Sequence, residues 1–227
     1  MINIFIGYDD REAIVYHVCS NSILRHASEP VSITPLTLNS LKGYTETHSD
    51  GSNKFIYSRF LVPFLMKYGG WALFIDGDMI LRGDISELWK LRDPNKAILV
   101  VKHDYKTKAT EKYLGSKNEN YPRKNWSSVV LWNCPHPANY LVTPDFVMSS
   151  SGAQLHRFTW LTDDLIGELP ITWNWLPDEF GENSNANLLH WTLGAPCFHE
   201  YSTAPMSSEW HRELIFASLC KQSDIQE

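Results

Sequence analysis

Two carboxylates separated by one glycine form the segment of this sequence best suited to chemistry. Asp76-Gly77-Asp78 follows an apolar run, residues 73–75, that is typical of a buried strand. In α/β sheets, ligands bind beyond the carboxyl ends of the strands. Neighbouring carboxylates repel each other, so a cation that neutralises both stabilises the pair. Oxygen ligands suit Mg²⁺ or Mn²⁺, and we expect such a cation at Asp76 and Asp78.

The same segment has two other interpretations. Asp-Gly is a common turn pair, so both carboxylates could simply be solvated in a turn. Asp76-x-Asp78-x-Ile80 also resembles the motif of the haloacid-dehalogenase phosphatases, in which Asp76 would be the nucleophile and Asp78 a general acid/base. In that family the pair normally follows the first strand, whereas here a whole α/β unit precedes it. A Mg²⁺-dependent phosphatase is therefore the alternative function.

The composition is that of a folded protein and limits the possible partners. The chain has 227 residues (26.1 kDa), of which 43% are hydrophobic and 20% charged. The formal net charge is −6, which disfavours nucleic acid, because proteins that bind it usually carry a basic surface. Aromatic residues reach 13%, with nine Trp. So many Trp suit a core and also a pocket that stacks flat rings or sugars.

The cysteines and the apolar segments predict a cytoplasmic location. The four Cys are scattered through a chain long enough to bury a core without disulfides, which favours a reducing compartment. No apolar run approaches the ~20 residues that a membrane helix needs. The apolar start of the chain predicts a first strand instead of a signal peptide. We therefore expect no transmembrane segment.

Strands alternate with helices from the N-terminus, which predicts an α/β fold with a mixed, mostly parallel central sheet flanked by helices. Strands are expected at residues 2–6, 31–36, 71–75, 79–81, 97–101 and 127–132. A first helix should follow Asp9 or Asp10 and pack residues between Ile14 and Leu24. Further helical segments are expected at residues 54–68, 84–89, 137–166 and 207–220. Pro63 predicts a kink in the second helix or a later start. Residues 103–125 are predicted to be a surface excursion that could cover a site.

Several segments, taken in order, resemble one family of enzymes. They are residues 4–9 (IFIGYD), 57–63 (YSRFLVP), 73–78 (LFIDGD) with 83–89 (GDISELW), 162–166 (TDDLI), 169–174 (LPITWN) and 190–194 (HWTLG). This set is similar to the metal-dependent GT-A glycosyltransferases, most closely to family 8, which includes glycogenin and bacterial galactosyltransferases. The resemblance covers roughly residues 2–200 and implies a GT-A fold with a Rossmann-like core.

The resemblance also implies an activity and a domain organisation. A UDP-sugar would donate its sugar to a carbohydrate or other hydroxyl acceptor, with retention of anomeric configuration. A single domain is expected over residues 1–227, with the nucleotide bound mainly by residues 1–100 and the donor sugar and acceptor mainly by residues 101–227. The oligomeric state stays open. Asp76, Asp78 and His190 would hold Mn²⁺, with Mg²⁺ possible, because an imidazole ligand favours Mn²⁺.

The family assigns roles to further positions of this sequence. The residues expected to bind the nucleotide or the donor are Gly7, Tyr8, Asp9, Arg59, Gly77 and Gly194. Asp163 and Asp164 would be catalytic and reach the sugar hydroxyls from a helix start, with Asp163 in the place of the family's Gln below the anomeric carbon. The candidates for sugar or acceptor contacts are Trp126, Ser127, Asn133 and Trp191. Without the resemblance, the same residues could be helix caps, core aromatics or surface charges.

One part of the family pattern is missing. The family often ends in His-x-x-Gly-x-x-Lys-Pro-Trp, and its Lys holds the diphosphate. Here an extra residue separates His190 from Gly194, and residues 195–198 (APCF) contain no Lys. Lys54, His211 or Arg212 could replace it. The acceptor side is expected in the C-terminal tail, where Tyr201 and Trp210 are further candidates.

Overall fold

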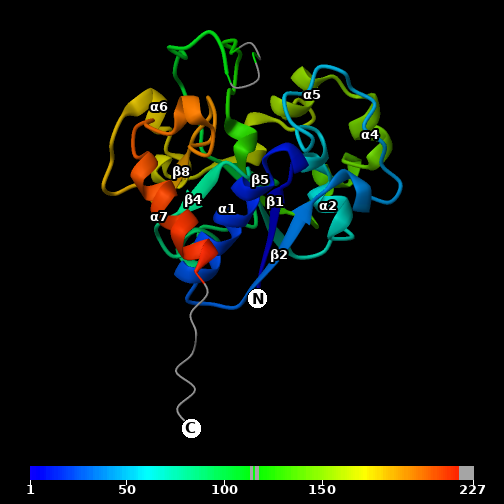
Figure 1. Ribbon diagram of the computed structural model, residues 1–227. Helices are drawn as coiled ribbons and strands as arrows, with labels where there is room; N and C mark the ends of the chain where they lie inside the picture. Colours follow the sequence, from blue (N-terminus) through cyan, green and yellow to red (C-terminus); the bar gives the residue numbers. More distant parts are fainter. Residues whose placement is uncertain (113–114, 116–117, 220–227) are drawn as a thin grey trace.

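A six-stranded sheet forms the centre of the computed structural model, which describes residues 1–112, 115 and 118–219 (Figure 1). Its strands are β1 (Ile2–Gly7), β2 (Val31–Leu36), β3 (Trp71–Ile75), β5 (Ile98–Val100), β6 (Val129–Asn133) and β7 (Ile166–Glu168). They lie in the order β2-β1-β3-β6-β5-β7. Only β6 runs against the other strands of this sheet, so the predicted mixed, mostly parallel sheet is confirmed.

Helices cover both faces of this sheet. The α-helices are α1 (Ala13–His26), α2 (Val62–Leu65), α3 (Ile85–Lys90), α4 (Pro144–Ser149), α5 (Gly152–His156), α6 (Pro177–Phe180) and α7 (Ser207–Ser218). Single 3₁₀ turns lie at Asp10–Glu12, Leu38–Ser40, Ser58–Leu61, Trp126–Ser128, Pro137–Leu141, Asp163–Leu165, Ile171–Asn174 and His199–Tyr201. In Figure 1, α1 and α7 lie to one side of the sheet and α2, α4 and α5 to the other. None of the helices in the described residues could span a membrane.

The period of two along each strand divides the core into two layers. Ile4 and Ile6 of β1 pack with Ile75 of β3 and with α1 and α3. Phe5 and Phe74, from the same two strands, pack on the opposite face with α2, α4 and α5. Both strands therefore bury nearly every residue, as expected for central strands of an α/β sheet.

A second, two-stranded sheet connects distant parts of the chain. β4 (Met79–Leu81) leaves the end of β3 and pairs antiparallel with β8 (Leu188–His190). Met79 lies opposite His190 in this register. The backbone N–H of Trp191 also donates to the carbonyl of Asp78, at 3.3 Å. The pairing brings the segment after β3 next to the end of β8.

Two of the expected helices differ in the structure. The helix expected at residues 54–68 begins only at Val62, because Pro63 has no N–H to donate and suits the first turn of a helix. The helix start expected at residues 162–166 is a single 3₁₀ turn that leads into β7. Strand pairing between Ile166 and Ile98 takes the place of helix propagation there.

The buried face of α1 also differs from the prediction, and α7 leaves apolar side chains exposed. Leu24 is 60% exposed, and Ile215 and Leu219 are 59% and 54% exposed. The two helices contact each other, and Arg25 pairs with the buried carboxylate of Glu213 at 2.6 Å. Val18 of α1 and Trp210 of α7 also belong to one apolar cluster, so this contact combines an ion pair with apolar packing. Cys220, at the predicted end of α7, lies outside the described residues.

Candidate active site

Three potential metal ligands meet at the edge of the sheet where β1 and β3 end. Asp76 follows β3, Asp78 precedes β4, and His190 ends β8. One ligand atom from each of these residues lies within 4.8 Å of the other two. His190 Nε2 is 3.3 Å from Asp78 Oδ1 and 3.8 Å from Asp76 Oδ2. The β4–β8 pairing therefore assembles this cluster from positions more than 100 residues apart in the sequence.

A buried amide fixes the orientation of the His190 ring. Asn174 is fully buried, and its Nδ2 donates to the carbonyl of Asn125 at 3.2 Å. Its Oδ1 therefore faces His190 Nδ1, at 2.9 Å, so this ring nitrogen carries the proton and donates it. In a neutral ring, the lone pair of Nε2 then points at the two carboxylates. Three electron-rich groups facing one another need a cation between them.

The electrostatics of the carboxylates agree with such a cation. Asp78 Oδ1 is buried and receives no hydrogen bond, which is costly for a carboxylate oxygen unless a cation binds it. Burial raises the pKa of Asp76, whereas the Arg59 guanidinium lowers it. The ligand set of two carboxylate oxygens and one imidazole nitrogen fits Mn²⁺ or Mg²⁺, and the imidazole favours Mn²⁺.

Arg59 is the fixed positive charge beside this cluster. Its side chain is nearly buried, and Nη1 lies 2.7 Å from Asp76 Oδ1. Its Nε donates to the carbonyl of Ile56, and Nη1 also donates to the carbonyl of Ser127. The guanidinium lies 5.3 Å and 5.0 Å from the centres of the Phe55 and Phe74 rings. Arg59 therefore positions Asp76 and has little freedom to reach a ligand itself.

The cluster lines one wall of a large cavity. Its volume is about 730 Å³, which is enough for a nucleotide-sugar-sized ligand. The other walls come from residues 49–59, from Lys112 and residues 119–125 of the excursion, and from the end of α5. Ser127, one of the expected sugar contacts, lines this cavity, and its Oγ lies 2.7 Å from Nδ1 of His156. Burial holds the pKa of His156 far below its ordinary range, so its ring is neutral.

The two residues expected to be catalytic lie elsewhere. Asp163 and Asp164 are exposed, and Asp163 forms an ion pair with Arg123. Both precede β7, which runs parallel to β5, so they lie at the end of these strands opposite to the acidic cluster. Neither residue lines the cavity in this structure, because a 3₁₀ turn and a strand replace the expected helix. The catalytic role of Asp163 and Asp164 stays a prediction.

The side chains of two expected sugar contacts also do not line the cavity. Asn133 pairs with Trp71 at the far end of the β3–β6 ladder, where its side chain donates to the carbonyls of Pro94 and Lys96. Trp191 is fully buried in the core beneath α7, and its Nε1 donates to the carbonyl of Pro205. Both residues stabilise the fold in this structure instead of facing the cavity.

Trp126 lies near the cavity but does not line it. Its Nε1 donates to the carbonyl of His103 at 2.9 Å, and Lys102 and Arg123 lie over its ring. The indole is partly buried against the core. Its contacts in the structure are therefore with the excursion and with these two cations.

Protein atoms occupy the space beside the three expected ligand-binding glycines. A Cβ on Gly77 would lie 2.7 Å from the carbonyl oxygen of Gly7, and a Cβ on Gly7 would lie 2.3 Å from the Phe55 ring. A Cβ on Gly194 would lie 2.3 Å from the Tyr201 ring. Close packing between chain segments explains glycine at these positions. The Gly7–Gly77 approach holds the ends of β1 and β3 together.

The expected base-binding residues have partners within the chain. Asp9 is buried and caps the turn at Asp10–Glu12. Its oxygens accept hydrogen bonds from the Arg11 guanidinium and from the backbone N–H of Lys54, and these bonds lower its pKa against the effect of burial. Tyr8 packs edge-on against Tyr16, with ring centres 5.5 Å apart.

The cations proposed to replace the missing lysine are paired elsewhere. Lys54 lies 2.5 Å from Asp10, Arg212 pairs with Glu209, and His211 Nε2 lies 2.9 Å from the carbonyl oxygen of Ser202. None of them lines the cavity. The lining cations that sequence reasoning missed are Lys112, Lys124 and Arg157. The sequence around these residues is polar and has no regular periodicity, so it does not indicate which side chains point into the cavity.

Comparisons with known proteins agree on one family. The model of the family described as "Glycosyl transferase family 8" matches residues 10–133, more than half of the chain. Protein CDI of Arabidopsis thaliana is 42% identical over 220 residues, which cover 93% of this chain and 85% of that protein.

Solved glycosyltransferases share the fold at low sequence identity. The bifunctional glycosyltransferase WbbM superposes with a TM-score of 0.65 and 16% identity over 94% of this chain. The match spans 49% of WbbM, about half of its length. The galactosyltransferase LgtC superposes with a TM-score of 0.62 and 12% identity, covering 97% of this chain and 98% of that one. Nothing in these matches supports the phosphatase alternative. The chain belongs to glycosyl transferase family 8 and is a nucleotide-sugar glycosyltransferase with the GT-A fold.

Proposed function

We propose that this enzyme transfers a sugar from a UDP-sugar to a hydroxyl group of a carbohydrate or other acceptor, with a divalent cation held by Asp76, Asp78 and His190. The observation that carries the proposal is the convergence of these three groups on the wall of the cavity, with the His190 lone pair directed at two carboxylates. Retention of configuration follows from the family resemblance. Binding of the nucleotide mainly by residues 1–100 and a cytoplasmic location stay predictions.

The cation explains how an acidic protein can bind a diphosphate. Mn²⁺ or Mg²⁺ supplies Lewis-acid stabilisation of a diphosphate leaving group when it is bound. The chain has a net charge of −6 and therefore attracts no phosphate through its overall charge. Asp76, Asp78 and His190 concentrate cation binding at one point of the cavity. Arg59 holds Asp76 in place beside them.

Nucleotide binding tests this proposal directly. We expect UDP to raise the melting temperature only when Mn²⁺ or Mg²⁺ is present, because the cation links the carboxylates to the diphosphate. Differential scanning fluorimetry with UDP, GDP, ADP and inorganic phosphate measures the effect. His190→Ala should remove the metal-dependent part of the shift. Stabilisation by phosphate alone, with no preference among nucleotides, would instead favour a phosphatase.

Asn174 should control the metal affinity without contacting the metal. In Asn174→Leu, His190 Nδ1 loses its acceptor and the ring loses its fixed tautomer, so the dissociation constant for Mn²⁺ should rise by about 10- to 100-fold. Isothermal titration calorimetry with Mn²⁺ measures this constant. Asn174→Asp retains an acceptor for Nδ1 and is the matched control. Equal Mn²⁺ affinities in the wild type and in Asn174→Leu would show that His190 is not a ligand.

A further inference from the structure

The charges at the acidic cluster leave the donor diphosphate without a full counter-charge. A divalent cation balances the carboxylates of Asp76 and Asp78, and the guanidinium of Arg59 is already 2.7 Å from Asp76. Each phosphate of a nucleotide-sugar carries a negative charge of its own. Binding them in a partly buried cavity requires another positive group nearby.

Among the described residues, four cationic side chains line the cavity, and two of them are already held by other groups. They are Arg59, Lys112, Lys124 and Arg157. Arg59 is held by Asp76 and by two backbone carbonyls. Lys124 Nζ donates to Asn118 Oδ1 and to the carbonyl of Glu119, both at 2.6 Å. Lys112 and Arg157 remain as groups that can turn toward a ligand.

The charge of Lys112 interacts with the acidic cluster across the cavity. Burial lowers the pKa of Lys112, and the carboxylates of Asp78 and Asp76 only partly oppose this lowering. Lys112 lines the cavity together with both of them, yet forms no ion pair with any described residue. A lysine that lines the same cavity as two carboxylates and pairs with neither leaves room for a ligand between the charges.

A buried polar network fixes the chain on both sides of Lys112. Glu179 of α6, 5% exposed, accepts hydrogen bonds from Thr107 Oγ1 at 2.5 Å and from the backbone N–H of Lys108 at 3.2 Å. Asn118, 6% exposed, donates to Thr107 Oγ1 at 2.6 Å and receives the bond from Lys124. These contacts tie residues 107–110 to residues 118–124.

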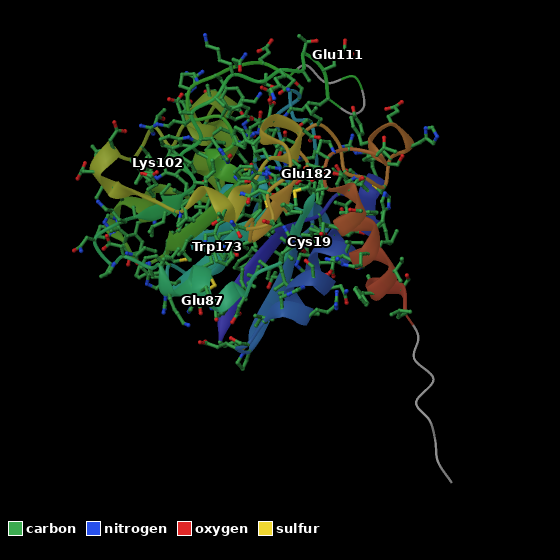
Figure 2. All side chains as sticks on the ribbon, turned by 90° about the vertical axis from the view of Figure 1, so that its left-hand side faces the viewer. Cys19, Glu87, Lys102, Glu111, Trp173 and Glu182 are labelled. Carbon is green, nitrogen blue, oxygen red and sulfur yellow. The ribbon has the colours of Figure 1, made fainter. Side chains whose placement is uncertain are left out.

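The described residues of the excursion are therefore a built part of the cavity wall. They lie above the edge of the sheet at which β1 and β3 end (Figure 1). Glu111, a residue of the excursion, is labelled at the top of the molecule in Figure 2, far from the interior residues Cys19 and Trp173. Burying Glu179 and Lys124 costs free energy, which the hydrogen bonds of this network offset. The network thereby positions residues 107–110 and 118–124 beside the cavity.

We propose that Lys112 binds the diphosphate of the donor, in the role of the lysine that is missing after Gly194. Its Nζ donates charge-assisted hydrogen bonds to phosphate oxygens and offsets the negative charge that remains on UDP when the sugar leaves. The excursion thus contributes to donor binding as well as covering the cavity. This inference rests on the proposed use of a UDP-sugar.

Binding of UDP and of uridine by charge variants tests the role of Lys112. Lys112→Met should weaken UDP binding in the presence of Mn²⁺ by about 10- to 100-fold, measured by isothermal titration calorimetry. Uridine lacks phosphates, so its affinity, measured by ligand-observed NMR in the absence of Mn²⁺, should stay the same. Lys112→Arg should retain UDP binding within a few-fold. Lys106→Met, an exposed change on the same excursion, is the matched control and should have no effect.

The outcomes separate this inference from the proposed function. Wild-type affinity of Lys112→Met for UDP would overturn the role of Lys112 while leaving the UDP-sugar proposal intact. An equal loss for UDP and uridine would also overturn it, because that pattern indicates damage to the cavity. A selective loss of UDP in Arg157→Met but not in Lys112→Met would assign the role to Arg157. Failure of the wild type to bind UDP with Mn²⁺ would contradict the proposed function and this inference together.

Discussion

Asp78→Asn is expected to lower kcat/KM for sugar transfer by about 1,000-fold or more, without lowering the free energy of unfolding. A bound cation contributes several kcal/mol to stabilisation of the leaving group, and each 1.36 kcal/mol corresponds to about tenfold in rate. Asp78 Oδ1 is a buried oxygen with no hydrogen-bond donor, 3.3 Å from His190 Nε2. An amide has nearly the same shape but binds divalent cations far less strongly.

The stability part of this prediction distinguishes a functional carboxylate from a structural one. Arg59 pairs with Asp76 and not with Asp78, so Asp78→Asn breaks no ion pair of the fold and removes repulsion between two carboxylates. Metal-free urea unfolding should show equal or higher stability. UDP release from a panel of UDP-sugars with Mn²⁺ measures activity. Glu119→Gln, an acid lining the same cavity, is the control and should stay within a few-fold of the wild type. Comparable activity in Asp78→Asn would exclude Asp78 as a metal ligand.

The central part of the fold could be predicted because its signals are local. The apolar run before Asp76 and the glycines near it predict a buried strand followed by a turn, and the structure confirms β3 and β4 there. Pro63 predicts an interrupted or delayed helix, and α2 begins at Val62. In each case the residues that determine the element lie within it, so the local sequence is enough to predict the strand or the helix start.

The meeting of His190 with the carboxylates could not be derived in this way. It depends on pairing between β4 and β8, and neither strand has a sequence signal that identifies its partner. The family resemblance supplied His190 where the pattern of residues could not. The same resemblance placed Asp163 at the start of a helix, whereas the pairing of Ile166 with Ile98 forms a strand directly after it.

The side chains of the cavity wall were the least predictable. Residues 103–125 indicate a surface excursion through their composition, but the inward direction of Lys112 depends on Glu179, which lies about 70 positions further along. The aromatic residues were also ambiguous. Trp132, Trp191 and Trp210 are almost completely buried, so core packing accounts for part of the Trp excess that also suited a sugar-stacking pocket.

Arg59→Met should lower the free energy of unfolding by about 3–5 kcal/mol in metal-free buffer. Asp76 is 6% exposed and Arg59 4% exposed, so removing the guanidinium leaves a buried carboxylate without its main counter-charge. Methionine fills a similar volume between the Phe55 and Phe74 rings, which limits the loss of packing. Urea denaturation followed by circular dichroism measures the change. Arg212→Met, which removes the exposed ion pair with Glu209, is the matched control and should change stability by less than about 1 kcal/mol.

The double variant Arg59→Met/Asp76→Asn separates charge from packing. If the uncompensated carboxylate causes the loss, replacing it with a neutral amide should recover most of the stability lost in Arg59→Met. Mn²⁺ should also stabilise Arg59→Met, because binding to the folded state alone raises the free energy of unfolding. It should stabilise the double variant much less, since one ligand oxygen of the cluster is then neutral. Equal stability of the single and double variants would show that Arg59 acts through packing, and a metal effect of the same size in both would exclude Asp76 from the metal site.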